Sequence, residues 1–581
     1  MKITHLNKEQ KLDYMKELYS SARLAYSDDL DEYEKNLAQY RGSEEIDGSD
    51  ERAITVRNIT YEIIESQISS DIPLPKVDAI FYSEKRDRCA KSIERLLHSL
   101  RGKLDYMSLN DLDERYTYIY GGSVFYVEWD NSVKQGKEIG AIKLHCLPPR
   151  DFIPQPNVSS VDDMEYFFLS FTTTRGELSA KFSIRDEDIL LAECESTEAE
   201  DHAGDGDTVS LAICFYKDED GDVGKYVHSG SLVLEDIPKY YYRKREKCAV
   251  CGLDASECEC GGETVTENII YEIDGIKDVF SDIPVGNPIP YYVPKSFPVV
   301  LRKNTSADGK IFGQSDCYYI RPEQQAINKI ESRILKKLLR AGVTPIVPED
   351  ASISLNNSVF GQLIKIKPGE SISQYGKVDT TPDISQDIAE AERLYDHSKR
   401  ILGISDALQG LDTIKNESGY ARQLRINQAT GRLQSKRKMK HGAYALVDKL
   451  IFEHYLAFAD EPRALTYKDA YGRIHNMDFC RYDFLEYDES DDTVYFDDGF
   501  LFKVDLNEGA EWQREDLWQR NLENLKAGTL GDPTDPATLL RYWQSQERAH
   551  YPFARENVEY FLEAQKKTEG GFPIGEEEIL D

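Results

Sequence analysis

Residues 314–341 read QSDCYYIRPEQQAINKIESRILKKLLRA. The apolar side chains recur at the spacing of one helix face, which predicts a single uninterrupted helix. The stripe contains Ile320, Ile327, Ile330, Ile334 and Leu338. At ~1.5 Å per residue, we expect a helical element about 40 Å long.

The segments after this helix change pattern three times. Residues 343–383 look like short strands and turns, and residues 384–402 return to helical spacing. A glycine-containing break follows, and a second long helix is predicted over residues 418–458. The glycines of the break are Gly403, Gly410 and Gly419. They permit a loop that moves, because glycine adopts backbone conformations closed to other residues.

The first part of the chain is helical and then rich in strands. Helical spacing occurs over residues 8–40, 53–70 and 83–101, and Gly121-Gly122 breaks a further helix. The period then changes to two, with Phe125, Val127 and Trp129 alternating with polar neighbours. This alternation predicts a half-buried antiparallel sheet.

Strand patterns continue to residue 300 and recur over residues 464–504. The chain returns to helix over residues 511–566, where Asp535-Pro536 is a predicted helix start with proline at the first helical position. Trp512, Trp518 and Trp543 are expected to be core anchors there. Runs of strands and runs of helices in separate parts of one chain predict the α+β fold class.

The composition excludes several classes of protein. The formal charge of the 581 residues is −34, which disfavours a protein that wraps nucleic acid, because phosphate binding needs clustered cations. Hydrophobic residues make up 40%, enough for large cores, so global disorder is excluded. No apolar run approaches the ~20 residues that span a bilayer, so we expect no membrane insertion. No secretory signal is visible at the start.

Four of the ten cysteines crowd into thirteen residues. In a reducing compartment such a cluster indicates a metal before it indicates disulfides. Tetrahedral zinc takes four thiolates, and a Cys-x-x-Cys turn aims two of them at one point. The predicted ligands of a structural zinc within residues 247–262 are Cys248, Cys251, Cys258 and Cys260. Free thiols and adventitious metal are the alternatives.

Residues 418–447 carry seven cations and no Asp or Glu. In a chain this acidic, such a helix is expected either to contact DNA or to pair with acidic groups of its own or a neighbouring subunit. The cations are Arg422, Arg425, Arg432, Lys436, Arg437, Lys438 and Lys440.

Common enzyme signatures are missing, and we expect no enzymatic activity. The chain has no phosphate-binding Gly-x-x-x-x-Gly-Lys loop, no His-Glu-x-x-His and no Gly-x-Ser-x-Gly. Residues 218–222 resemble the start of a calcium loop, but Val223 stands where glycine is required, so a hairpin turn is predicted. Acidic residues 488–492 are expected to be a charged loop; as metal ligands, Asp491 and Asp492 would indicate a hydrolase.

The order of these parts resembles the portal proteins of tailed double-stranded-DNA bacteriophages. The resemblance covers most of residues 50–567. It depends on the succession of four motifs, each of which is weak alone. They are RNITYEIIE (57–65) running into IPLP (72–75), GGSVFYV (121–127) before LPPRDFIP (147–154), GQSD (313–316) opening the first long helix, and GISDAL (403–408) followed by SGYA (418–421).

The resemblance implies a ring, usually of about twelve subunits, at one capsid vertex. Double-stranded DNA would pass through its channel during packaging and ejection. The implied partners are the terminase large subunit, the major capsid and scaffolding proteins, and a head-completion or neck adaptor. The protein would assemble in the host bacterial cytoplasm and reside in the virion. A zinc-containing nucleic-acid-binding adaptor module is the alternative function.

The family's parts map onto this chain by position. In chain order they are wing (1–313, with the cysteine cluster as an insertion), stem helix 1 (314–341), clip (342–383), stem helix 2 (384–402), tunnel loop (404–417), long wing helix (418–458), wing return strands (459–508), crown (509–567) and a disordered tail (568–581). Candidate residues facing the tunnel or DNA are Lys415, Arg422, Arg425, Arg432 and Lys436.

Overall fold

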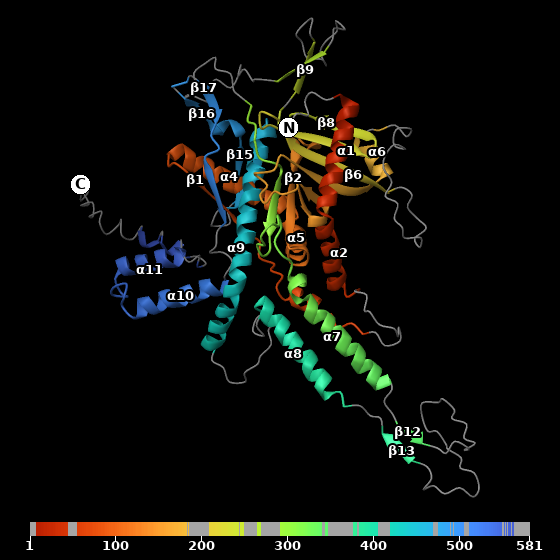
Figure 1. Ribbon diagram of the computed structural model, residues 1–581. Coiled ribbons are helices and arrows are strands. Elements are labelled where there is room, and N and C mark those ends of the chain that lie inside the picture. Colours follow the sequence, from red (N-terminus) through yellow and green to blue (C-terminus); the bar gives the residue numbers. More distant parts are fainter. Residues whose placement is uncertain are drawn as a thin grey trace, which may run out of the picture. The chain divides into compact units, whose positions relative to one another are not determined.

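The computed structural model divides into two compact units, Met1–Val504 and Asp505–Asp581 (Figure 1). We describe each unit by itself. The residues that the structure describes are 7–43, 55–136, 138–182, 184, 208–242, 244–248, 264–268, 291–339, 343–346, 376–379, 383–404, 419–468, 474–488, 490–491, 493–504, 511–548, 551, 554, 556–558 and 560–562.

The first unit mixes helices with antiparallel strands, which confirms the predicted α+β class. Its helices are α1 (Lys8–Ala25), α2 (Ser27–Arg41), α3 (Ile59–Glu65), α4 (Glu84–Lys103), α5 (Tyr106–Tyr120), α6 (Arg175–Phe182), α7 (Asp316–Leu339), α8 (Ser385–Leu402) and α9 (Gly419–Phe458).

The strands of this unit form one five-stranded sheet, one three-stranded sheet and several two-stranded ladders within the described part of the chain. The five-stranded sheet has the order β4 (Phe152–Pro154), β5 (Tyr166–Thr174), β6 (Thr208–Lys217), β7 (Val223–Ser229) and β8 (Leu232–Ile237). The three-stranded sheet has the order β11 (Val299–Lys303), β2 (Gly122–Gln135) and β3 (Glu138–Leu147).

The two-stranded ladders join segments at very different distances along the chain. They are β1 (Pro75–Ala79) with β18 (Phe500–Val504), β9 (Lys244–Cys248) with β10 (Thr264–Asn268), β12 (Val343–Ile346) with β13 (Gly376–Asp379), β14 (Arg463–Lys468) with β15 (Ile474–Phe479), and β16 (Leu485–Asp488) with β17 (Thr493–Phe496).

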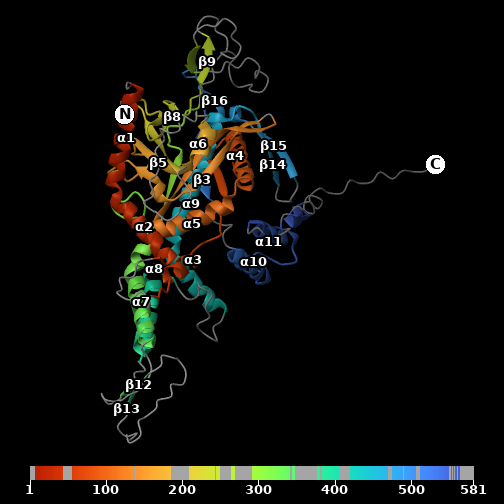
Figure 2. The same ribbon diagram turned by 90° about the vertical axis from the view of Figure 1, so that its right-hand side faces the viewer.

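The first half of β5, in the five-stranded sheet, is buried on both faces. Tyr166 and Phe168 of β5 pack on one side with Met15 of α1, whereas Phe167 and Leu169 join the main core on the other side. Figure 2 shows α1 running beside this sheet. Alternate residues of the strand therefore serve two cores, which explains why residues 166–169 are all apolar and buried.

The helix α9 lies against the three-stranded sheet and carries the main core. Its buried residues include Tyr444, Val447, Ile451, Phe452 and Leu456. Tyr444 contacts Phe125 of β2 edge to face, at 5.4 Å between ring centroids. The second predicted long helix is thus confirmed, and its C-terminal half is held by aromatic packing.

The helices α7 and α8 pair along their length, and the ladder β12–β13 joins them at one end (Figures 1 and 2). Ile330 and Ile334 of α7 pack against Ala391 of α8. Arg333 and Lys337 of α7 both bind Asp387 of α8. The predicted helix–strand–helix order is confirmed as a helical hairpin with a strand ladder at its tip.

Two helix predictions in the first part differ from the structure. The pattern over 8–40 divides at Tyr26, where the Ser27 hydroxyl donates to the Leu24 carbonyl at 2.9 Å. The pattern over 53–70 gives only the short helix α3, because the Ser66 hydroxyl binds the Ile63 carbonyl at 2.7 Å and Gln67 turns toward α7. Local side-chain bonds compete with helix propagation in both places.

The second unit contains α10 (Glu511–Lys526) and α11 (Pro536–Arg548). The helix α11 begins as predicted, with the Asp535 side chain accepting the Ala537 N–H at 3.2 Å. Trp518 and Trp543 both contact Tyr551. Asn521 donates to the Ser545 carbonyl at 3.3 Å, so polar contacts also join the two helices.

Within the described residues of both units, no helix is long and apolar enough to cross a bilayer. The tail predicted over 568–581 lies outside the described residues.

Gly121 provides a direct test of how the sheet and α7 meet. Its φ is +92°, and a Cβ there would lie 2.2 Å from the Gly313 carbonyl oxygen. We expect Gly121→Ala to lower the free energy of unfolding by about 3 kcal/mol, since backbone strain and steric overlap add. Urea unfolding of the full chain measures this.

Gly102→Ala in α4 is the matched control, because nothing lies within 4 Å of a Cβ at that position. Its unfolding free energy should stay within about 1 kcal/mol of the wild type. Equal effects of the two substitutions would contradict the close approach of Gly121 to Gly313.

Candidate functional site

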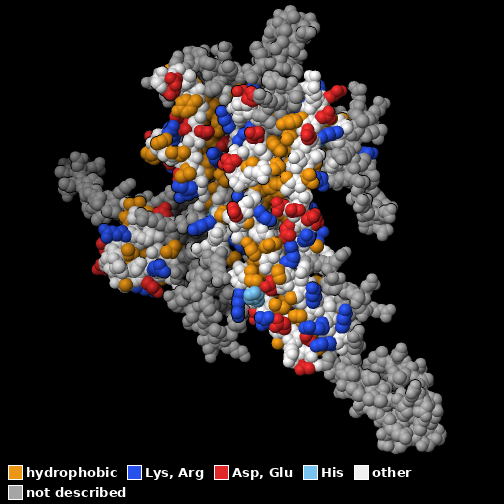
Figure 3. Space-filling model, in the orientation of Figure 1, with side chains coloured by type: hydrophobic (Ala, Val, Ile, Leu, Met, Phe, Trp, Pro, Cys, Tyr) orange, Lys and Arg blue, Asp and Glu red, His pale blue; other side chains and the backbone are white. Residues whose placement is uncertain are grey.

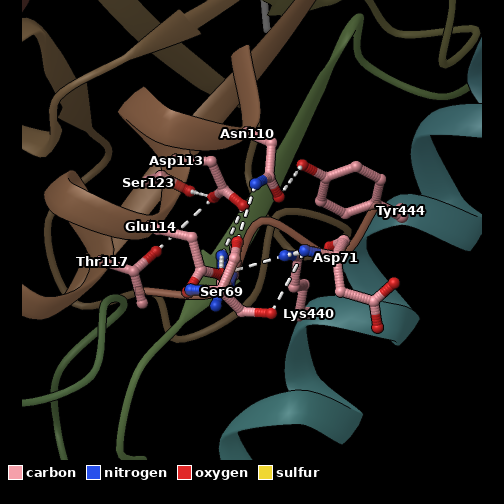
Figure 4. Close-up of polar contacts among 10 residues, drawn as sticks. Ser69, Asp71, Asn110, Asp113, Glu114, Thr117, Ser123, Lys440 and Tyr444 are labelled. Atoms are coloured by element: carbon pink, nitrogen blue, oxygen red, sulfur yellow. Dashed lines mark hydrogen bonds and ion pairs between the residues drawn. The ribbon is translucent and has the colours of Figure 1, made fainter. Parts of the chain in front are cut away.

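A cluster of ionised side chains lies buried where α5, α9 and β11 meet (Figure 4). Asp113 and Glu114 are consecutive residues of α5, and Arg302 enters from β11. The Arg302 guanidinium pairs with the Asp113 carboxylate and lies 2.8 Å from that of Glu114. All three side chains are essentially inaccessible to solvent.

Lys440 of α9 completes the cluster. Its ammonium lies 3.2 Å from the Glu114 carboxylate and donates to the Asp71 carbonyl at 2.6 Å. The Ser69 backbone N–H donates to Glu114 at 3.2 Å, and the Ser123 hydroxyl donates to Asp113. The segment of residues 69–71, which directly precedes the IPLP motif, is thereby tied to α5 and α9.

A second buried pair lies at the start of α7. Asp316 is the first residue of that helix, and Lys436 of α9 binds its carboxylate at 2.7 Å. Gln67 and Asn304 donate to the same carboxylate at 3.0 and 2.8 Å. A carboxylate in the first turn of a helix also interacts favourably with the helix dipole.

The two groups together form what we call the ionic junction: Asp113, Glu114, Arg302, Lys440, Asp316 and Lys436. Three carboxylates face three cations, so its formal charge is zero. Burial alone raises the pKa of Glu114, but the charges of Arg302 and Lys440 outweigh it, and the pKa falls below its usual value. Burial raises the pKa of Asp113, and the neighbouring Glu114 adds to this.

The ionic junction is suited to holding segments together. Its six charged groups are paired with one another, and its most exposed side chain, Lys436, is 13% exposed. It joins the sheet, α5, α9 and the start of α7. Isolated buried charges are costly, so this pattern fixes one relative arrangement of these segments.

Lys436 differs from its sequence prediction as a residue facing DNA. Its ammonium is held by Asp316 inside the protein, and Lys440 is buried as well. For these two cations of the basic helix, the expectation of internal pairing is confirmed. Arg437 and Lys438 are exposed.

The side chains of the other candidate tunnel residues lie outside the described part of the structure. Arg422, Arg425 and Arg432 lie on α9, but their side chains are outside the described part of the structure. Lys415 and the tunnel loop 404–417, apart from Ile404, also lie outside it.

Of the four predicted zinc ligands, Cys248 alone lies within the described residues. It is the last residue of β9, and its partner across the ladder is Thr264 of β10. The strands therefore bring the two ends of segment 249–263 together. Cys251, Cys258 and Cys260 fall in that segment, outside the described residues, and zinc remains a prediction.

The turn between β6 and β7 contains the other group of potential metal ligands in the described residues. Ligand atoms of Asp218, Asp220 and Asp222 lie within 4.8 Å of one another. Asp218 accepts the N–H groups of Asp220 and Asp222, and Asp222 binds Lys239 at 2.9 Å. These contacts are those of the predicted hairpin turn.

Of the two acidic residues considered as ligands of a hydrolase metal, Asp491 lies within the described residues and Asp492 lies outside them. The carboxylate of Asp488 is engaged by the Ser490 backbone N–H at 2.9 Å, as in a tight acidic turn.

Sequence reasoning missed the core of the ionic junction. Two signals were present: adjacent acids within the aromatic helix segment 106–120, and an arginine within the apolar strand segment 299–303. A charge inside a segment whose other residues are mostly apolar or aromatic indicates a buried partner. The sequence alone could not say which of many acids that partner is.

Replacing Arg302 tests how much the ionic junction contributes to the free energy of unfolding. Arg302→Met leaves Asp113 and Glu114 buried with one fewer counter-charge, so we expect the free energy of unfolding to fall by about 3–5 kcal/mol. Arg393→Met is the control: the Arg393 side chain is 69% exposed and pairs with Glu390 one helical turn away, so its replacement should change the free energy of unfolding far less than Arg302→Met does. Similar losses in both variants, measured by urea unfolding, would contradict the assignment.

A buried histidine on α9 makes stability depend on pH. His454 is inaccessible to solvent, and its Nδ1 lies 2.7 Å from the Leu450 carbonyl oxygen. Burial lowers the pKa of His454 to about 4. The unfolded chain binds that proton near pH ~6.5, so the contribution of His454 to stability is complete above that pH. It is lost as the pH falls through the folded pKa.

We expect His454→Phe to weaken the acid sensitivity of the protein. Between pH ~6.5 and ~4 the wild type should lose up to about 3 kcal/mol of unfolding free energy that the variant does not lose. His397→Phe, at a 60% exposed side chain, is the control. Thermal melting across this pH range checks the difference; parallel pH curves for wild type and His454→Phe would refute it.

Comparisons with known proteins do not assign this chain to a family. No protein-family model matches it, and no curated protein matches it. Any functional assignment therefore depends on the residues and geometry described above.

Proposed function

We propose that this chain is the subunit of a portal ring of a tailed double-stranded-DNA bacteriophage. In that role the ring is the channel for DNA packaging and ejection. It is also the docking site for the terminase large subunit and the head-completion or neck adaptor. The observation that carries the proposal is the helical hairpin α7–α8, which has a strand ladder at its tip and is followed by the long helix α9.

The proposal assigns a role to each part of this succession. The helices α7 and α8 are the two stem helices, and the β12–β13 segment is the clip that meets the motor and the adaptor. Residues 404–417 are the tunnel loop, and α9 is the long wing helix. The sheets are wing, and α10 with α11 are crown; the second compact unit begins at Asp505, close to the predicted start of the crown.

The ionic junction supports this assignment in mechanical terms. A stem that bears load from a packaging motor needs a rigid root. The first residue of α7 is bound by Lys436 of α9, Gln67 and Asn304. The main chain of Gln314, just before α7, also pairs with Thr305 at 2.7 Å. The root of the proposed stem is therefore fixed to the sheet and to α9 together.

The charges of α7 suit a channel that touches DNA only weakly. Cations gather toward its C-terminal end, as Figure 3 shows on the lower part of the molecule. They are Lys329, Arg333, Lys336 and Lys337. Asp387 neutralises part of this charge by binding Arg333 and Lys337. In a chain of net charge −34, a few cations among many anions let a polyanion pass without strong retention.

Negative-stain electron microscopy with native mass measurement tests the proposal. The expected result is rings with a central hole, and a mass near twelve times the 66.5 kDa of one chain. Assembly is examined with and without a co-expressed scaffolding protein, because ring formation can need such a partner. ATP hydrolysis and nuclease assays on the same sample should show no turnover.

A chain that stays monomeric or dimeric at high concentration and with scaffold would reject the ring. If that chain also binds one zinc and loses DNA binding when the metal is removed, the adaptor module is the better assignment. Loss of a measured hydrolytic activity on changing Asp491 and Asp492 would instead identify a hydrolase.

A further inference from the structure

Three consecutive large hydrophobic residues project into solvent between β1 and α4. Ile80, Phe81 and Tyr82 are 56%, 71% and 86% exposed. We call them the apolar knob. Figure 3 shows hydrophobic side chains on the surface where β1 and α4 lie. A contiguous exposed patch of this kind marks an interaction surface far more often than a scattered single residue does.

The apolar knob is held at both ends. The β1–β18 ladder ends at Ala79, and the Ile80 N–H then donates to the Gly499 carbonyl at 3.0 Å. On the other side Ser83 caps α4 by accepting the Arg86 N–H at 3.1 Å. A segment fixed in this way loses little conformational entropy when it binds.

A groove lies on a different part of the same unit, between α1, the start of α2 and the strands β5–β7. Its volume is about 970 Å³. Leu24, which is 76% exposed, and Tyr19 supply apolar surface. The volume lies at the upper end of the ~300–1,000 Å³ typical of binding clefts, so the groove has room for two aromatic side chains.

The cations of the groove have no ion-pair partner in the described structure. His228 of β7 lines it, is 5% exposed, and neither of its ring nitrogens has a hydrogen-bond partner of normal geometry in the described structure. Lys16 and Arg23 bind only the hydroxyls of Ser231 and Tyr19, and no described carboxylate forms an ion pair with them. Asp31 is the one carboxylate among the lining residues. The groove thus offers cations and a buried imidazole to an incoming group.

The apolar knob presents the complementary chemistry. Phe81 and Tyr82 supply aromatic surface and a hydroxyl, and the exposed Glu84 follows at the first residue of α4. The Glu84 carboxylate can pair with Lys16 and Arg23, and the two aromatic rings can pack against Leu24. Aromatic residues seated in a pocket with a charged rim are the usual anchors of protein interfaces.

The two surfaces are far apart on one chain, since α1 and α4 lie on opposite sides of the first unit in Figure 1 and remain separated in Figure 2. One copy therefore cannot fill its own groove. Identical subunits close into a ring only through a heterologous contact, in which two different patches of the chain meet. A knob and a groove on opposite sides meet that requirement.

We propose that the apolar knob of one copy occupies the α1–β7 groove of the next copy, with Glu84 facing Lys16 and Arg23. This inference rests on the proposed ring and names the residues that join its neighbouring subunits. The occupant is a second copy of this chain.

Site-specific photo-crosslinking tests the contact directly. A benzoyl-phenylalanine replaces Tyr82 in the full chain, and cross-linked peptides are identified by mass spectrometry. The expected product joins position 82 to residues 16–31 or 208–231 of another copy, as distinguished by mixing isotopically labelled and unlabelled chains. The same probe at Met107, which is 67% exposed and belongs to neither surface, should give no such product.

Charge exchange gives a second, independent readout. Lys16→Glu with Arg23→Glu should raise the concentration needed for half-assembly by about tenfold or more, and adding Glu84→Lys should recover part of the loss. Met107→Ser should leave assembly unchanged. Thermal melting confirms that each variant is folded.

The outcomes separate this contact from the ring itself. Rings whose position-82 cross-links map elsewhere, or whose assembly ignores the charge changes, overturn the contact and leave the ring intact. A chain that never assembles overturns both.

Discussion

The paired charges of Asp113, Glu114, Arg302 and Lys440 are inside the protein, where an unpaired charge costs several kcal/mol. Because each group needs its counter-charge, α5, β11 and α9 can meet only in the arrangement that brings all four together. These elements come from distant parts of the chain. The main core is therefore organised around a polar constraint, with aromatic packing such as Phe125 against Tyr444 beside it.

The second part of the ionic junction extends this constraint to α7. Asp316 takes its counter-charge from Lys436, one turn before Lys440 on the same helix α9. The helix α9 thus fixes the sheet and the helical hairpin with neighbouring residues on one face. If the chain forms a portal ring, a displacement at the hairpin is passed to the sheet through rigid contacts, since such contacts do not deform gradually.

Charge is used differently inside the protein and on its surface. Buried cations such as Arg302 and Lys440 are paired with internal carboxylates, so they cannot meet an external anion. Those that remain accessible include the end of α7 and the groove beside α1. In a chain of net charge −34, these accessible cations are the groups that an external anion can meet. They also favour contacts between copies in which an acidic group of one meets a cation of the other.

Periodicity alone determined the long elements. The helices over 316–339, 385–402 and 419–458 and the strands after Gly121 follow from the spacing of apolar residues, because that spacing reports which face of an element is buried. The order helix, strands, helix, long helix was also readable, and it carries the family resemblance. The internal pairing of Lys436 was not readable, because a basic residue at that position is compatible both with facing DNA and with pairing inside the protein.

Tertiary structure decided which side chains meet. The pairing of Arg302 with Asp113 spans most of the first 300 residues, and no local pattern selects one acid among 105 acidic residues. The close approach of Gly121 to Gly313 is likewise decided by the tertiary structure, because nothing in the two glycine motifs indicates that their backbones are in contact. Periodicity reports local burial, whereas partners distant in sequence are chosen by the packing of whole elements, which depends on all of them at once.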